Sequence, residues 1–171
     1  MSFNILVLCT GNSARSIIGE MLFNHLGKGR IKAYSAGSKP SGVVNPVALE
    51  TLQIHGIPCG GSRSKSWDEF GPNKENAAVS PAPTFDFIFT VCSNAANEVC
   101  PVWPGHPSTA HWTIPDPAHV EPLAARREAF ETAYQSLRKR IEAFLALPLE
   151  SMNREEAVAA ARKIHTDIAG V

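Results

Sequence analysis

A short apolar run near the N-terminus, Ile5-Leu6-Val7-Leu8, narrows the choice of fold more than any other part of the sequence. An unbroken run of this kind is typical of a strand buried on both faces, and we predict a strand at residues 3–8. Cys9 follows it, and small residues then lead into a helical pattern over 14–27. A buried strand followed by a helix begins a parallel β–α–β unit, so we expect an α/β protein.

The alternation of strand and helix patterns continues along the chain. Further strands are predicted at 31–37, 85–92 and 109–114, and further helices at 45–55, 122–146 and 154–168. Residues 57–83 are rich in Gly, Ser and Pro and are predicted to be mostly loop, with one helical turn near 67–70; residues 93–108 are predicted to be irregular. These elements predict a doubly wound, four-stranded parallel sheet with helices on both faces and an extra C-terminal helix.

Length and charge restrict the functional classes. The chain has 171 residues, a length typical of one domain. Its 16 basic residues balance 16 acidic ones, which argues against nucleic acid or an anionic membrane as a partner. No apolar run approaches the about 20 residues of a membrane span, and the N-terminus lacks the features of a signal peptide. We therefore expect a cytoplasmic protein whose four cysteines are reduced at rest.

Cys9 stands where a parallel sheet binds its ligands, just beyond the carboxyl end of a strand. Backbone N–H groups at the start of the following helix can bind an anion, and Arg15 offers a planar fork to two oxygens of a tetrahedral oxyanion. The same positive field favours the thiolate of Cys9, which Ser16 can hydrogen-bond. The alternative is a buried structural cysteine near a surface arginine. The predicted oxyanion-binding residues are Thr10, Gly11, Asn12, Ser13, Ala14 and Arg15.

Two other predicted strands end near residues that can join Cys9. Cys92 ends the strand at 85–92, with Cys100 eight residues further on, and Asp116 follows the strand at 109–114. Asp116 is the candidate acid that protonates a departing oxygen, although an aspartate between two prolines is also common in turns. Parallel strands end at one edge of a sheet, so we expect Cys9, Cys92 and Asp116 to share one site.

The stretch VLCTGNSARS resembles the C-x5-R-S phosphate loop of low-molecular-weight protein tyrosine phosphatases and of the arsenate reductases built on the same fold. The resemblance covers about residues 3–146 and includes YSAG at 34–37, CSNAANEVCP at 92–101 and HWTIPDPA at 111–118. It implies one domain over 1–171, with a core of about 3–146 and an extra helix of about 153–169. Ala14 departs from both branches, which often carry a second cysteine there.

The two branches share their first step, attack by the loop cysteine, and differ in the next one. A phosphatase hydrolyses the adduct on Cys9 with water, whereas a reductase delivers two electrons from thiols that end as a disulfide. In the arsenate reductases, cysteines matching Cys92 and Cys100 form this relay. The resemblance therefore favours arsenate reductase, with no tightly bound cofactor and with thioredoxin or glutathione and glutaredoxin as the external thiol reductant.

Two alternatives remain open: a low-molecular-weight phosphatase that forms a phosphocysteine on Cys9, and a non-catalytic oxyanion or redox sensor. Phosphatases of this fold usually place aromatic residues directly after the Asp-Pro pair, whereas Ala118 and His119 follow here. No zinc spacing fits the cysteines, so no metal centre is predicted. Asn12, Glu20 and Ser35 resemble positions that help bind potassium in some reductases of the family; hydrogen bonds that shape the loop are the alternative.

Overall fold

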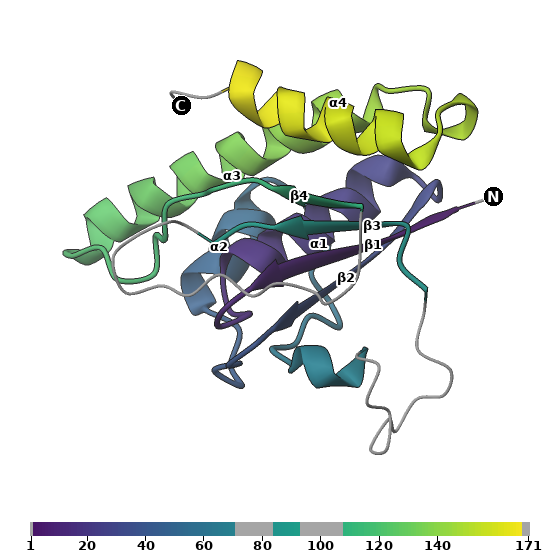
Figure 1. Cartoon of the computed structure of the whole chain (residues 1–171). Coiled ribbons are helices and arrows are strands. Elements are labelled where there is room, and N and C mark those ends of the chain that lie inside the picture. Colours follow the sequence, from purple (N-terminus) through teal and green to yellow (C-terminus); the bar gives the residue numbers. More distant parts are fainter. Residues whose placement is uncertain (1, 71–83, 93–107, 169–171) are drawn as a thin grey trace.

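A computed structural model describes residues 2–70, 84–92 and 108–168. The predicted strands and helices form in the expected order (Figure 1). The helical turn predicted near 67–70 is present as a short 3-10 helix, and the described residues include one further 3-10 helix at 149–151. The elements are β1 (Phe3–Cys9), α1 (Arg15–Gly27), β2 (Ile31–Gly37), α2 (Pro46–Ile54), η1 (Trp67–Glu69), β3 (Phe87–Thr90), β4 (Thr109–His111), α3 (Leu123–Leu145), η3 (Leu149–Ser151) and α4 (Arg154–Asp167). The predicted division into a core and an extra helix stays a prediction, although α4 itself forms.

The sheet has four parallel strands in the order β2-β1-β3-β4, which confirms the predicted architecture. Its register aligns the carboxyl ends of the strands. Cys9 lies opposite Gly37, while Leu8 pairs with Thr90, which pairs in turn with His111. The segments that follow β1, β3 and β4 therefore start from the same edge of the sheet.

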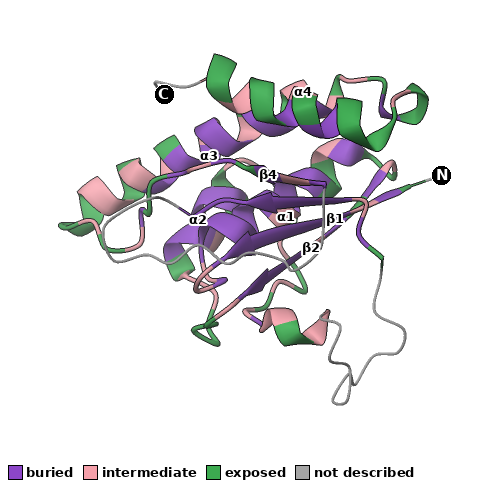
Figure 2. Ribbon diagram, viewed as in Figure 1, coloured by how far each residue is buried: buried purple, intermediate pink, exposed green. Residues whose placement is uncertain are grey.

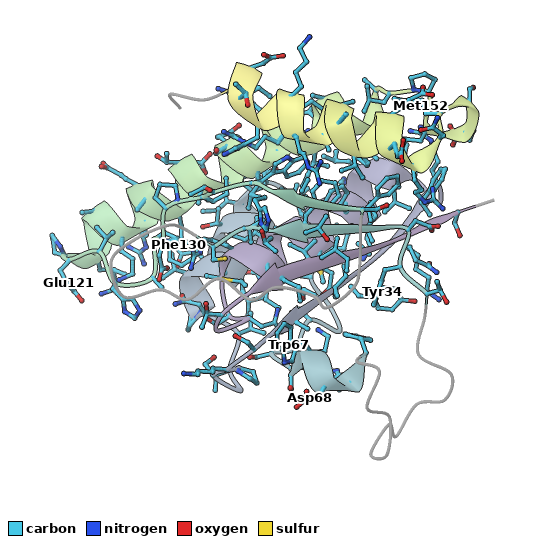
Figure 3. The ribbon with its side chains drawn as sticks, viewed as in Figure 1. Tyr34, Trp67, Asp68, Glu121, Phe130 and Met152 are labelled. Carbon is cyan, nitrogen blue, oxygen red and sulfur yellow. The ribbon has the colours of Figure 1, made fainter. Side chains whose placement is uncertain are left out.

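Alternating side chains of β1 divide the core between the two faces of the sheet. Ile5 and Val7 belong to the larger cluster, which includes the buried sides of α1 and α3, and Figure 2 shows these strands and helix faces as buried. Leu6 and Leu8 belong to a smaller cluster on the other face, where Trp67 of η1 packs. Figure 3 shows Trp67 between η1 and the sheet. Among the described residues, η1 is the helix on this second face.

Two helices begin where the sequence predicts, because an asparagine side chain accepts a hydrogen bond from the first helical turn. Asn45 accepts from the Val47 N–H ahead of α2, with Pro46 at its first position. Asn153 accepts from the Glu156 N–H at the start of α4. Each of these capping hydrogen bonds joins residues two or three positions apart, so the start of the helix can be predicted from the sequence.

β3 and β4 are shorter than the strands predicted at 85–92 and 109–114. The last hydrogen bond along this ladder runs from the Trp112 N–H to the Thr90 carbonyl. Beyond it, the carbonyl of Ile114 accepts a hydrogen bond from Arg15 instead of a neighbouring strand. The strand therefore ends where the chain turns toward α1.

Helix α4 packs over β4 and α3. The Trp112 indole Nε1 donates to the Ala161 carbonyl at 2.9 Å, and Ala157, Val158 and Ala161 are buried. Small side chains on this face allow the indole to reach the helix backbone. None of the helices in the described ranges is long and apolar enough to cross a membrane.

Gly37 is expected to tolerate no side chain. A Cβ atom at this position would overlap the Thr10 carbonyl oxygen and lie 3.0 Å from the Asn12 backbone nitrogen. Backbone atoms cannot move aside cheaply, so Gly37→Ala is expected to lower the free energy of unfolding by about 2–3 kcal/mol. Urea denaturation measures the change. Gly60→Ala is the control, because a Cβ there meets nothing within 4 Å, and equal effects of the two substitutions would contradict the clash.

Candidate active site

Cys9 is the last residue of β1, the strand that lies between β2 and β3. The residue is 4% exposed, and neither Cys9 nor Cys59 is in a disulfide bond. Parallel strands on both sides hold its backbone at the edge where all four strands end. The predicted nucleophile therefore lies at the base of the loop that follows it.

The loop after Cys9 turns three of its carbonyl groups toward residues 39–45. The Thr10, Gly11 and Ser13 carbonyls accept hydrogen bonds from the N–H groups of this segment, at 3.0, 3.0 and 2.8 Å. In a trans peptide the C=O and the following N–H point in opposite directions. The N–H groups of Gly11, Asn12 and Ala14 consequently point away from residues 39–45, and α1 begins directly after them. Such an arrangement suits an anion.

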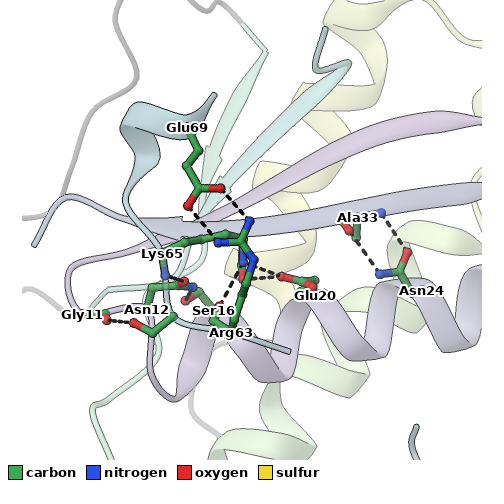
Figure 4. A network of polar contacts seen from close by, with 11 residues as sticks. Gly11, Asn12, Ser16, Glu20, Asn24, Ala33, Arg63, Lys65 and Glu69 are labelled. Carbon is green, nitrogen blue, oxygen red and sulfur yellow. Dashed lines mark hydrogen bonds and ion pairs between the residues drawn. The ribbon is translucent and has the colours of Figure 1, made fainter. Parts of the chain in front are cut away.

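Asn12 keeps the loop in shape. Its φ of 45° lies in the left-handed region, which asparagine tolerates better than most residues. The side chain is fully buried: Nδ2 donates to Ser16 Oγ at 2.7 Å, and Oδ1 accepts from the Lys65 N–H at 2.8 Å (Figure 4). Ser16 is thereby oriented from the loop side.

Arg15 joins the loop to the ends of β3 and β4. It is 3% exposed, and Nη1 donates to the Ile114 carbonyl at 2.8 Å and more weakly to the Val91 carbonyl at 3.4 Å. Nη2 lies 3.7 Å from Asp116 Oδ2. The guanidinium is therefore held in a set orientation, as a bidentate grip on an oxyanion requires.

Asp116 lies at the rim of the site. Its side chain is 34% exposed, and Oδ1 accepts the Ala118 N–H at 2.9 Å in a turn. His119 Nε2 is 3.9 Å from the other carboxylate oxygen. Asp116 thus occupies a turn, and its carboxylate faces Arg15.

Cys92 follows β3 at the same edge of the sheet. It is 3% exposed and is disulfide-bonded in the structure. The preceding residue, Val91, donates its N–H to the Leu8 carbonyl, which keeps this segment beside β1. The structure therefore brings Cys9, Arg15, Cys92 and Asp116 to one edge, whereas Cys100 lies outside the described residues.

Behind the loop, the positions that resemble a potassium site form a polar cluster. Ser35 donates to Glu20 Oε1, and Lys65 Nζ lies 3.6 Å from the same oxygen. In the described part of the chain, including this cluster, no group of three His, Cys, Asp or Glu side chains could hold a metal ion.

The fold and the loop can be compared with known proteins. Residues 4–158 match the family model described as low molecular weight phosphotyrosine protein phosphatase. The chain belongs to this family. The arsenate reductase of Shouchella clausii is 33% identical over 141 residues, which cover 82% of this chain and 93% of that protein.

The solved structures that resemble this chain include both an arsenate reductase and a tyrosine phosphatase. The arsenate reductase of Archaeoglobus fulgidus is 26% identical with a TM-score of 0.60, over 81% of this chain and 98% of that chain. The tyrosine phosphatase Wzb of Escherichia coli K30 shares the fold at 23% identity and a TM-score of 0.62, over 85% and 97% of the two chains. The fold alone thus does not separate reduction from hydrolysis.

Two contributors to this site are absent from the sequence prediction. Residues 39–45 anchor the loop through backbone groups, which leave no signature in side-chain types. The sequence assigns no role to Lys65, because its contacts with Asn12 and Glu20 join segments far apart in the chain.

Asp116→Asn is expected to slow the step that releases the first oxygen, because an amide cannot donate the proton. We expect kcat to fall by about 100-fold or more, with little change in KM. The measurement is steady-state turnover of arsenate and of an aryl phosphate. Asp68→Asn is the control, since Asp68 is exposed and points away from the sheet (Figure 3). An unchanged kcat in Asp116→Asn would exclude it as the acid.

Proposed function

We propose that this chain is an arsenate reductase that uses cysteine thiols as the reductant. The observation that carries the proposal is the position of Cys92, which follows β3, the strand next to β1, and is disulfide-bonded. Hydrolysis of an adduct on Cys9 needs no second sulfur at this edge, whereas reduction of arsenic needs one. The 33% identity to the Shouchella clausii arsenate reductase supports the same branch.

The first step uses the groups of the loop. Arsenate binds to the N–H groups of the loop and to the Arg15 guanidinium. The Cys9 thiolate attacks arsenic and forms an As–S bond, while one arsenate oxygen leaves as water after Asp116 supplies a proton. Arg15 and the loop N–H groups stabilise the negative charge on the remaining oxygens.

The second step transfers two electrons. The Cys92 thiolate attacks Cys9 Sγ, so an S–S bond forms and the As–S bond breaks. The electron pair of the broken bond stays on arsenic, which is reduced from As(V) to As(III) and leaves as arsenite. The two sulfurs are oxidised together to one disulfide, and the electrons balance.

The disulfide must then be reduced for another turnover. Cys100 is the proposed resolving thiol, and thioredoxin or glutathione with glutaredoxin is the proposed external donor. No tightly bound cofactor takes part in these steps. The proposed partners are therefore the oxyanion and a thiol-redox protein.

A phosphatase activity is the second candidate, because Cys9, Arg15 and Asp116 suit the first step of both reactions. The residues after Asp116 argue against an aryl substrate. Ala118 is small, and the His119 side chain is 89% exposed. A non-catalytic oxyanion or redox sensor is the third reading.

The deciding experiment is one anaerobic turnover of fully reduced protein with arsenate and no external thiol. We expect one arsenite per chain and the loss of two of the four thiols, with inorganic phosphate as the control that consumes none. Arsenate that consumes no thiol, together with phosphate release from an aryl phosphate, would identify a phosphatase. Oxyanion binding without either activity would support a non-catalytic oxyanion or redox sensor.

A further inference from the structure

A lysine amine occupies the polar cluster behind the loop. The Lys65 and Glu20 side chains are 7% and 12% exposed, and Lys65 Nζ also donates to the Arg63 carbonyl at 3.0 Å. A potassium ion held by Glu20 would stand within a few ångströms of this ammonium group, and two positive charges so close repel each other strongly in a buried site. The residues present therefore do not fit potassium.

The backbone of Lys65 is tied to the oxyanion loop, and its side chain is tied to α1, the helix that follows the loop. Its N–H donates to Asn12 Oδ1, and its carbonyl accepts the Gly37 N–H at 2.9 Å. Its partner Glu20 lies on α1, one turn after Ser16. Figure 4 shows this chain of contacts from the loop to the ion pair.

We propose that the Lys65 ammonium is a built-in counter-ion of Glu20 that positions the oxyanion loop and takes the place of a bound monovalent cation. The inference deepens the proposed function, on which it rests for the identity of the oxyanion. Lys65 touches no substrate in this account and is a positioning residue.

The charge of Glu20 explains why this counter-ion matters. Residues four apart on a helix are neighbours, so the Glu20 carboxylate stands close to Ser16 and the start of α1. Without a cation it would be a buried, uncompensated negative charge beside a site that binds an anion. Its field would then oppose oxyanion binding, and Lys65 cancels that field.

The other charges around Lys65 largely cancel each other. Arg63 and Glu69 form an exposed ion pair, with Nη2 2.6 Å from Oε1. Burial lowers the pKa of the Lys65 ammonium below the usual lysine value, although the Glu20 carboxylate acts in the opposite direction. Lys65 thus loses its proton at a lower pH than exposed lysines do.

The test compares Lys65→Met with Lys139→Met, an identical change at an exposed lysine of α3. Calorimetric titration with inorganic phosphate is run in choline, sodium and potassium chloride at equal ionic strength. We expect wild type and Lys139→Met to bind phosphate equally in all three salts. Lys65→Met is expected to bind about tenfold more weakly in choline chloride. Potassium should restore part of this loss, because the oxygens of Glu20, Ser35 and the Arg63 carbonyl remain as ligands.

Two further variants separate charge from shape. Lys65→Met combined with Glu20→Gln removes both charges and is expected to bind phosphate more tightly than Lys65→Met alone. Lys65→Arg keeps a positive charge at every accessible pH. Phosphate affinity of the wild type is therefore expected to fall at alkaline pH as Lys65 is neutralised, whereas Lys65→Arg should lack that fall.

Wild-type phosphate affinity that requires potassium would overturn the proposal, as would unchanged affinity in Lys65→Met. If Lys65→Met does not fold, the double variant and the salt dependence of phosphate binding to the wild type still test the proposed role of Lys65. Phosphate binding is measured without arsenite formation, so a failure of the reductase proposal is distinguishable from a failure of this one.

Discussion

Cys92→Ser is expected to abolish multiple-turnover arsenate reduction and to leave slow aryl-phosphate hydrolysis by Cys9 intact. A hydroxyl cannot form a disulfide, so the As–S adduct on Cys9 has no internal route to arsenite. A thiol positioned at the same sheet edge reacts with the effective concentration of a bound group, far above that of any external thiol. Arsenite production per enzyme, followed over many equivalents of arsenate, measures the loss.

Cys59→Ser is the control for Cys92→Ser, because Cys59 is half-buried, is not in a disulfide and has no proposed role. Its arsenate turnover is expected to match that of wild type. Cys100→Ser should stall after one turnover with Cys9 and Cys92 linked, unless an external thiol such as glutathione substitutes. Peptide mapping of alkylated, non-reduced protein identifies the linkage. Full turnover in Cys92→Ser would refute the relay.

Arg15→Lys is expected to lower kcat/KM by about 100- to 1,000-fold, nearly as much as Arg15→Ala. A lysine keeps the charge but has no planar fork. In Arg15, Nη1 donates to the Ile114 carbonyl while the guanidinium presents other N–H groups to an oxyanion. The single amine of a lysine does not reproduce this arrangement. Steady-state kinetics with arsenate and with an aryl phosphate measure the effect on both chemistries.

Arg127→Lys is the control for Arg15→Lys, since Arg127 is an exposed arginine of α3 that pairs with Glu50. Its kcat/KM is expected to equal that of wild type. Near-normal kcat/KM in Arg15→Lys would show that the guanidinium plane is not needed, and the proposed grip on the oxyanion would be wrong.

Local features of the sequence predict much of this fold. The unbroken apolar run of β1, the caps at Asn45 and Asn153 and the helical spacing of α1 each depend on neighbours within a few residues. The parallel direction of the strands follows from their alternation with helices. The carboxyl-end rule then places Cys9, Cys92 and Asp116 at a common edge before any coordinates are known.

Features that depend on distant partners could not be predicted in this way. The end of β4 depends on whether the Ile114 carbonyl bonds a strand or Arg15, 99 residues away. The link from Lys65 to Asn12 spans 53 residues and uses a backbone N–H, which every residue except proline carries. Lys65 thus looks like an ordinary loop lysine in the sequence, although the structure buries it beside Glu20.

The hydrogen bonds from residues 39–45 to the loop carbonyls affect how fast an oxyanion binds. Residues 39–45 and the Asn12 side chain set the loop conformation when the protein folds, before any anion arrives. The entropy lost in ordering the loop is therefore absent from the binding free energy. We expect the oxyanion to associate in one rapid step without a conformational phase. Differences in affinity among oxyanions should then appear mainly in their dissociation rates.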